Sequence, residues 1–357
     1  MKFLFYFGHP AQYLALRETM LRLSEKHGIT ILIKTKDVLE DLLKNDGLPY
    51  TNVLPKERGA SRLAILLSLL KRMVIIFPII LKKKPDVLIG TDAALAQLGK
   101  LMNIHRITIL EDDYDVIKNL ADLTFPFTQT ILCPDVCNVG SWQSKKVGYR
   151  GYMKLGYLHP TIFTPDKTVL AKYRIPKDYL LIRLSRLAAH HDIGVRGLDE
   201  NLLDTIIQSA QKRDYDVLIT AEGIIADKYK SYQLQIAPAD IHHVLANAKL
   251  LISDSQSMSV EASMLGIPSI RYSSLVNKIS VLSELEIKYS LTFGIQIGET
   301  ERLLSTIDEL LSTPDLYDRF QRKRQKMLDD KIDVTSFWVD FFENYPVSRH
   351  NRVNTAV

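Results

Sequence analysis

Short apolar runs alternate with helical patterns along most of the chain, and this alternation restricts the fold more than any other feature. The predicted strands of the first half span 2–7, 29–33, 87–89, 107–110 and 130–132. The predicted helices between them span 13–26, 36–44, 61–81 and 93–102. Buried strands that alternate with helices are typical of a parallel sheet covered by helices on both faces.

The alternation stops between residues 149 and 177, where Gly, Pro, Tyr and Asp are frequent, and then begins again. Further strands are predicted at 179–184, 217–220, 250–253 and 269–272, and further helices at 198–212, 241–248 and 257–265. A chain of 357 residues also exceeds the roughly 250–300 residues that one core supports. We therefore expect an α/β protein with two Rossmann-like, doubly wound domains, 1–160 and 161–330, and a C-terminal helix and tail over 331–357. The two domains are expected to face a cleft that binds a ligand at the carboxyl ends of the strands.

Composition narrows the class of protein. Hydrophobic residues make up 46% of the chain and mean hydropathy is -0.02, values that are ordinary for a globular protein. The net charge of +5 is too small for a dedicated nucleic-acid binder, so we expect no nucleic-acid partner. The excess of positive charge lies in residues 1–150, which hold 21 Lys and Arg against 15 Asp and Glu. Cys133 and Cys137 have no Cys or His pair nearby to complete a zinc site, and we interpret them as free thiols in a reducing cytoplasm.

The segment 61–81 is nearly all Leu, Ile, Val and Met. Lys71, Arg72 and Pro78 interrupt it, so a transmembrane helix is not expected. Together with Lys82–Lys84 it suits a helix that docks on an anionic membrane where a lipid-linked acceptor waits. The alternative is a core helix under the sheet with solvated lysines at its end, and the continuous apolar pattern favours this burial on two sides.

The most informative segment runs from residue 250 to 271. A buried strand leads into the polar turn Asp254-Ser255-Gln256-Ser257, and a helix follows. Such a turn presents backbone N–H groups and the positive end of the helix dipole, which suits a phosphate. Glu261, one turn into the helix, is placed to accept hydrogen bonds from a ribose diol. In the purely structural alternative, Ser255 or Ser257 caps the helix and the Glu261 carboxylate interacts with the helix dipole, each stabilising the helix by about 1 kcal/mol. Of the two, we favour the nucleotide-binding role.

This segment resembles the nucleotide-binding segment of GT-B-type proteins. Asp254-Ser255, then Glu261-Ala262 and Leu265-Gly266-x-Pro268, is similar to the pattern of the nonhydrolysing UDP-N-acetylglucosamine 2-epimerases. Over residues 2–295 the chain resembles still more closely a bacterial and archaeal family of unknown function that is predicted to share the GT-B fold. The further matches are Gly8-His9-Pro10-Ala11-Gln12, Pro85-Asp86-Val87, Gly151-Tyr152-x-x-Leu155-x-Tyr157-Leu158-His159-Pro160, and Ala188-Ala189-His190-His191-Asp192.

The resemblance implies a UDP-type nucleotide sugar that is held mainly by the second domain. By this resemblance Ser255 would contact phosphate and Glu261 the ribose, and His242 would lie near the uracil. The epimerases carry paired glycines where this chain has Gln256-Ser257. Side chains there restrict how closely the backbone approaches a pyrophosphate. Gln256 and Ser257 stay candidate contacts with this restriction.

A basic segment follows the first strand of the second domain. Arg183 and Arg186 present guanidinium forks that suit phosphate oxygens, and His190 beside them can donate a proton. The alternative is a solvated basic loop. The epimerases carry His-Arg-Arg-Glu near this place, and its absence here argues against epimerisation itself.

Candidate catalytic residues come from the first domain. His9 follows the first strand, where peptidoglycan N-acetylglucosaminyltransferases show a similar Gly-His near the acceptor, and it can serve as general base. Asp92, Glu111 and Asp112 follow the strands at 87–89 and 107–110, in regions where the epimerases place catalytic carboxylates. A lone histidine is more often structural, and helix N-capping accounts for Asp92 almost as well.

These observations predict a UDP-sugar-dependent glycosyltransferase of bacterial surface polysaccharide or glycolipid synthesis, with a carbohydrate or lipid-linked acceptor. No metal or other cofactor is expected. We expect a cytoplasmic protein with possible peripheral contact to the inner face of the membrane. The alternatives are a nucleotide-sugar 2-epimerase-like enzyme and a non-catalytic nucleotide-sugar-binding protein.

Overall fold

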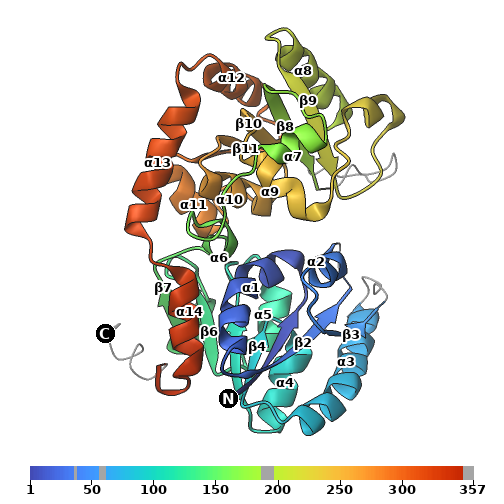
Figure 1. Cartoon of the computed structure of the whole chain (residues 1–357), viewed down its shortest axis with the longest axis vertical. Coiled ribbons are helices and arrows are strands. Elements are labelled where there is room, and N and C mark those ends of the chain that lie inside the picture. Colours follow the sequence, from blue (N-terminus) through green and yellow to red (C-terminus); the bar gives the residue numbers. More distant parts are fainter. Residues whose placement is uncertain (36–37, 56–61, 186–196, 349–357) are drawn as a thin grey trace. The chain divides into compact units, whose positions relative to one another are not determined.

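A computed structural model describes residues 1–35, 38–55, 62–185 and 197–348. The chain forms two compact units, of which the first contains Met1–Tyr157 and Lys331–Val357 and the second Leu158–Asp330 (Figure 1). Each unit has a parallel sheet between helices, as the alternation of strands and helices predicts. The α/β fold with two doubly wound sheets is confirmed.

The first unit is built on a seven-stranded sheet in which every neighbouring pair is parallel. Its strands are β1 (Lys2–Phe7), β2 (Gly28–Lys34), β3 (Thr51–Leu54), β4 (Val87–Gly90), β5 (His105–Ile109), β6 (Thr130–Pro134) and β7 (Lys146–Tyr149). The order is β3-β2-β1-β4-β5-β6-β7, so the direction of winding reverses between β1 and β4. In open α/β sheets such a reversal opens a crevice above the carboxyl ends of the two strands.

The helices of the first unit include the last helix of the chain. They are α1 (Pro10–Ser24), α2 (Leu39–Asn45), α3 (Arg62–Lys83), α4 (Ala93–Leu101), α5 (Lys118–Thr124) and α14 (Val334–Glu343), with a 3-10 turn at Gly140–Lys145. α14 packs against α1, as Figure 1 shows. It buries Trp338, Phe341 and Phe342 completely, and the Phe342 ring meets Phe5 of β1 edge-on. The chain end therefore completes the core of the first unit.

The second unit has a five-stranded parallel sheet in the order β12-β11-β10-β8-β9. Its strands are β8 (Tyr179–Leu184), β9 (Asp216–Ala221), β10 (Leu250–Ser253), β11 (Ser269–Tyr272) and β12 (Thr292–Ile295). Its helices are α7 (Thr168–Lys172), α8 (Glu200–Gln211), α9 (Ile241–Leu245), α10 (Gln256–Leu265), α11 (Ser280–Ile287), α12 (Thr300–Leu311) and α13 (Leu316–Asp330), with 3-10 turns at Asp227–Tyr232 and Pro238–Asp240. The short helix α6 (Leu155–Leu158) lies at the boundary of the two units.

Helix α3 corrects one prediction. Its inner face packs into the core through Leu69, Ile76 and Ile80, as expected of a core helix. Its outer face leaves large apolar side chains in solvent, with Val74 74% exposed, so the predicted burial on two sides is wrong. Periodicity shows only that both faces are apolar, and it does not show whether a second layer covers the outer one. Within the described residues, α3 and the other helices fall short of the length and apolarity that crossing a membrane requires.

Candidate functional site

The turn after β10 is organised as a helix N-terminus. Ser255 is the N-cap of α10, and its Oγ accepts a hydrogen bond from the Met258 N–H at 3.4 Å. The Ser255 N–H donates in turn to Ser253 Oγ at 2.8 Å. Ser255 thus caps the helix, as the structural interpretation predicts. The cap does not exclude an anion, because the N–H groups of Gln256 and Ser257 in the first turn have no acceptor within the helix.

A row of polar side chains crosses the sheet beside this turn. In the parallel register, Ser253 pairs with Arg183 on one side and with Arg271 on the other, so the three side chains share one face. Arg183 Nη2 lies 2.9 Å from Glu222 Oε1. Arg271 is 1% exposed, and its Nη2 lies 3.8 Å from Glu286 Oε2. Among the described residues, Arg183 Nε and Arg271 Nε and Nη1 find no hydrogen-bond acceptor.

These two guanidinium groups lie at the carboxyl edge of the second sheet, each beside one carboxylate. Burial lowers the pKa of Arg271, yet a guanidinium stays protonated at neutral pH. A buried cation with unused donors favours an anion nearby. Sequence reasoning assigned no role to Arg271, although a charged residue inside the predicted strand 269–272 was a visible signal.

Glu261 and His242, which the sequence connected only through the resemblance, lie together. His242 Nε2 of α9 is 3.5 Å from Glu261 Oε2 of α10, and both side chains are nearly buried. The Phe163 ring lies beside His242, with the two ring centroids 6.2 Å apart. The arrangement offers a carboxylate and an imidazole at the edge of an aromatic ring, which suits the hydroxyl groups and flat base of a nucleoside.

Asp254, which follows β10, hydrogen-bonds to the segment that follows the neighbouring strand β8. Its Oδ1 accepts a hydrogen bond from the Ser185 N–H at 2.6 Å, and removal from water raises its pKa. Gly197 approaches so closely that a Cβ there would lie 2.6 Å from Asp254 Oδ2. The predicted contacts Arg186 and His190 lie outside the described residues.

In the first unit, His9 begins α1. Its Nδ1 accepts a hydrogen bond from the Ala11 N–H at 3.2 Å, so in the neutral ring the proton sits on Nε2. Nδ1 of His9 therefore does not offer the free lone pair that a general base needs. Gln12, in the next turn, accepts from the Gly8 N–H and donates to Thr91 Oγ1. It connects the loops that follow β1 and β4 at the reversal point of the sheet.

Asp92 has a structural role. Its Oδ1 accepts from the Ala94 N–H at 2.8 Å as the N-cap of α4. Its Oδ2 lies 3.2 Å from Arg72 Nε of α3, and both side chains are buried. Arg72 also donates to Ser68 at 2.7 Å. These contacts engage both carboxylate oxygens, and they hold α3 against α4.

Glu111 and Asp112, one residue apart, have different surroundings. Glu111 Oε1 lies 2.7 Å from Lys154 Nζ with both side chains nearly buried, and Oε2 accepts from the Met153 N–H at 2.8 Å. Asp112 keeps contact with solvent. Even so, the loss of water around it raises its pKa, and the Glu111 carboxylate adds to the rise while Lys154 opposes it. Asp112 is thus the carboxyl whose surroundings favour its protonated form.

Lys154 is a second site residue, after Arg271, that sequence reasoning missed. It lies inside the segment Gly151-Tyr152-Met153-Lys154-Leu155, of which only the Gly, Tyr and Leu entered the resemblance. The distance of 43 positions from Glu111 to Lys154 gave no sign that the two would pair. In the described part of the chain, no group of three His, Cys, Asp or Glu side chains is arranged to hold a metal ion.

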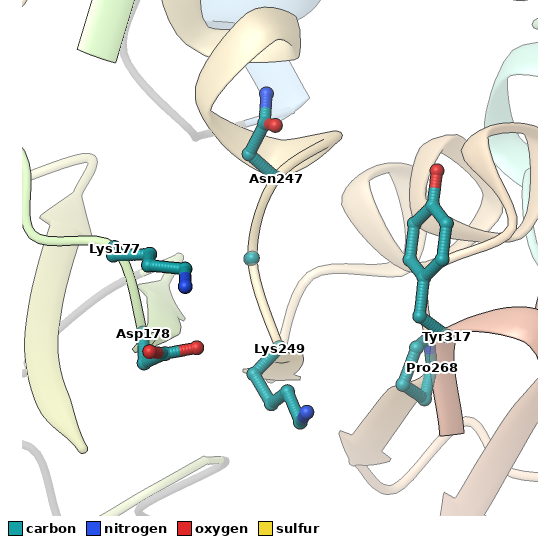
Figure 2. Close-up of a pocket in the computed structure, with 7 residues that line it drawn as sticks. Lys177, Asp178, Asn247, Lys249, Pro268 and Tyr317 are labelled. Atoms are coloured by element: carbon teal, nitrogen blue, oxygen red, sulfur yellow. The ribbon is translucent and has the colours of Figure 1, made fainter. Parts of the chain in front are cut away.

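A shallow pocket lies at the opposite edge of the second sheet (Figure 2). Asp178, Lys249 and Pro268 directly precede β8, β10 and β11, so the pocket is at the amino ends of these strands. Ligands of open parallel sheets bind at the carboxyl ends. We assign this pocket no part in the site.

Comparisons with known proteins give relatives in structure alone. No family model and no curated protein matches the chain. The UDP-GlcNAc 2-epimerase of Methanocaldococcus jannaschii is similar with a TM-score of 0.64 and 16% identity, over 88% of this chain and 94% of that one. The MnaA protein of S. aureus, solved with UDP, is similar with a TM-score of 0.71 and 12% identity over 96% of each chain. The glycotransferase of kitacinnamycin is similar with a TM-score of 0.58 and 13% identity, over 96% of this chain and 98% of that one.

At these identities the likeness establishes the fold. It extends over almost the whole of each chain, and both parallel sheets of the present chain belong to it. The chain therefore has the GT-B fold that epimerases and a glycosyltransferase share.

Proposed function

We propose that the chain is an enzyme that uses a UDP-sugar. The observation that carries the proposal is the contact between Glu261 and His242 beside the capped turn at Ser255. In this proposal Glu261 accepts hydrogen bonds from the ribose, and His242 with Phe163 lies along the base. The N–H groups of Gln256 and Ser257, with Arg183, receive the phosphates, and the buried charge of Arg271 adds to the positive potential there.

The reaction that we propose first is glycosyl transfer to a carbohydrate or lipid-linked acceptor. An acceptor hydroxyl oxygen forms a bond to the anomeric carbon, and the bond from that carbon to the phosphate oxygen breaks, so that UDP leaves. A base must take the hydroxyl proton. Asp112 suits this role because its raised pKa lies nearer to neutral than that of an ordinary aspartate. Asp92 and Glu111 are each engaged by a buried cation, and His9 directs its Nδ1 lone pair to its own helix.

Epimerisation at C2 of the sugar is the second candidate. Asp112 beside Glu111 supports it as well, because removal of a proton from carbon also needs a carboxylate of raised pKa. The absence of the His-Arg-Arg-Glu segment weighs against it. Incubating the protein with UDP-sugars in deuterium oxide without an acceptor distinguishes the two. Deuterium at C2 favours epimerisation, and transfer of the sugar to an added acceptor without such exchange favours the transferase.

Isothermal titration with UDP tests the binding site. Glu261→Ala is expected to weaken UDP binding roughly 10- to 100-fold, because a hydrogen bond to a charged group contributes about 1.5–3 kcal/mol. Glu301→Ala, the same substitution on the exposed face of α12, is the matched control and should leave the affinity unchanged. If the wild type fails to bind UDP at millimolar nucleotide, or if both variants bind equally well, the proposed site is wrong.

A further inference from the structure

Helix α3 presents an apolar surface to solvent. From Leu67 onward its exposed apolar side chains recur at intervals of three or four residues, and Leu66 lies four residues before Leu70, so they form one band along the helix. We call this band the outer stripe; it consists of Leu66, Leu67, Leu70, Val74, Phe77 and Leu81. Scattered exposed leucines are ordinary in globular proteins, but a continuous apolar band marks a contact surface.

The outer stripe is not the result of a loosely attached helix. On the opposite face Leu69, Ile76 and Ile80 pack with the core residues of β1 and β4. The buried ion pair between Arg72 and Asp92 fixes the same face against α4. The outer stripe is therefore held outward by a helix whose inner face is fully packed.

Charge indicates what covers this surface. From Arg62 to Lys84 the chain contains no Asp or Glu. Lys71 and Lys82 are separated by about three helical turns, so they lie along the same margin of the outer stripe. Lys83 and Lys84 follow at the end of the helix, and all four lysines are exposed. An apolar band with a margin of lysines complements a surface that is apolar inside and anionic at its boundary.

We propose that the outer stripe docks on the surface of an anionic lipid bilayer. The helix lies in the plane of the interface, with Leu67, Val74 and Phe77 among the acyl chains and the lysines at the headgroups. Docking in the plane agrees with the observation that α3, with its described neighbours, lacks the length and apolarity to cross the membrane. A second copy of the chain is a poorer occupant, since pairing two outer stripes brings their lysine margins toward each other.

This proposal rests on the face of α3 and stands or falls independently of UDP binding. Sedimentation with phosphatidylcholine vesicles, with and without phosphatidylglycerol, tests it. The wild type should bind the vesicles that contain phosphatidylglycerol, and it should dissociate from them as the salt concentration is raised. The double variant V74E/F77E should bind at least tenfold more weakly. Replacing Lys82, Lys83 and Lys84 by Gln should weaken binding about fivefold for each lysine removed.

Ile224→Glu and Ile287→Glu are the matched controls, because these side chains are also exposed and apolar but lie on the second unit. They should bind vesicles like the wild type. Far-UV circular dichroism checks that V74E/F77E remains folded, which is expected because neither residue is in the core. The proposal is overturned if the wild type ignores anionic vesicles or if V74E/F77E binds as well as the wild type. It is also overturned if the wild type sediments as a dimer that V74E/F77E converts to a monomer, since a second copy would then cover the stripe.

Discussion

The buried ion pair between Glu111 and Lys154 gives a prediction that the structure makes quantitative. The atoms are 2.7 Å apart, and the side chains are only 11% and 7% exposed. Replacing Lys154 by Met keeps the length of the side chain but leaves Glu111 charged and nearly buried. Removing one partner of a buried pair in this way typically destabilises a protein by about 3–5 kcal/mol. For a unit of this size that corresponds to a fall in Tm of roughly 6–20 °C.

The assay follows from the position of the tryptophans. Trp142 and Trp338 are the two tryptophans of the chain, and both lie in the first unit. Tryptophan fluorescence in urea therefore reports the unfolding of the unit that holds the ion pair. The double variant K154M/E111Q should recover part of the loss, because no uncompensated charge remains. Lys118→Met is the control, since the Lys118–Asp122 pair is exposed and its loss should not shift the transition measurably. A loss below about 1 kcal/mol for K154M, or one equal to that of the control, would refute the account of a buried, mutually dependent pair.

Two further outcomes are expected. Because Asp112 has a raised pKa, the folded protein holds its proton more tightly than the unfolded chain, so ionised Asp112 destabilises the fold at pH values above its folded pKa. In urea at pH 7, Asp112→Asn should therefore be at least as stable as the wild type, and its advantage in stability should be smaller at pH 4. The substitution should also lower sugar turnover roughly 10²- to 10⁴-fold. A variant less stable than the wild type at pH 7 would contradict the direction of the pKa shift. Gly266 ends α10 at φ +69°, where a Cβ would also lie 2.7 Å from Gln321 Nε2. Gly266→Ala should destabilise the second unit by at least about 1 kcal/mol, measured by circular dichroism in urea, whereas Gly223→Ala, with open space around it, should not.

The central strands of both sheets could be predicted from the sequence because both of their faces are buried. Residues 3–7 in β1 and residues 250–252 in β10, for example, are all apolar and stand out as continuous runs. The strands β3, β7 and β12 were missed, and all three lie at sheet edges. An edge strand has one neighbour and partial burial, so Thr51–Leu54 and Lys146–Tyr149 carry polar residues and too few apolar ones to form a recognisable run.

For the second unit, local sequence carried much of the candidate nucleotide site. Ser255, the first turn of the helix that it caps and Glu261 lie within seven residues, so spacing alone puts them at one helix N-terminus. The contact between Glu261 and His242 depends on how α9 packs beside α10, which spacing does not reveal. The row formed by Arg183 and Arg271 depends on strand order, because β8 and β11 both neighbour β10 in the sheet.

The acidic residues of the first unit show why a chemical role cannot be assigned from strand ends alone. Asp92, Glu111 and Asp112 all follow parallel strands and looked equivalent in the sequence. Folding brings Arg72 to Asp92 and Lys154 to Glu111, so each of these two carboxylates has a cationic partner. Asp112 has no such direct ion pair among the described contacts, and the charge of Glu111 beside it disfavours its ionised form. Because Lys154 holds Glu111 in place, the same ion pair that stabilises the unit keeps a negative charge beside Asp112. We therefore expect the acid–base chemistry to reside on Asp112, the carboxyl that the fold leaves least neutralised.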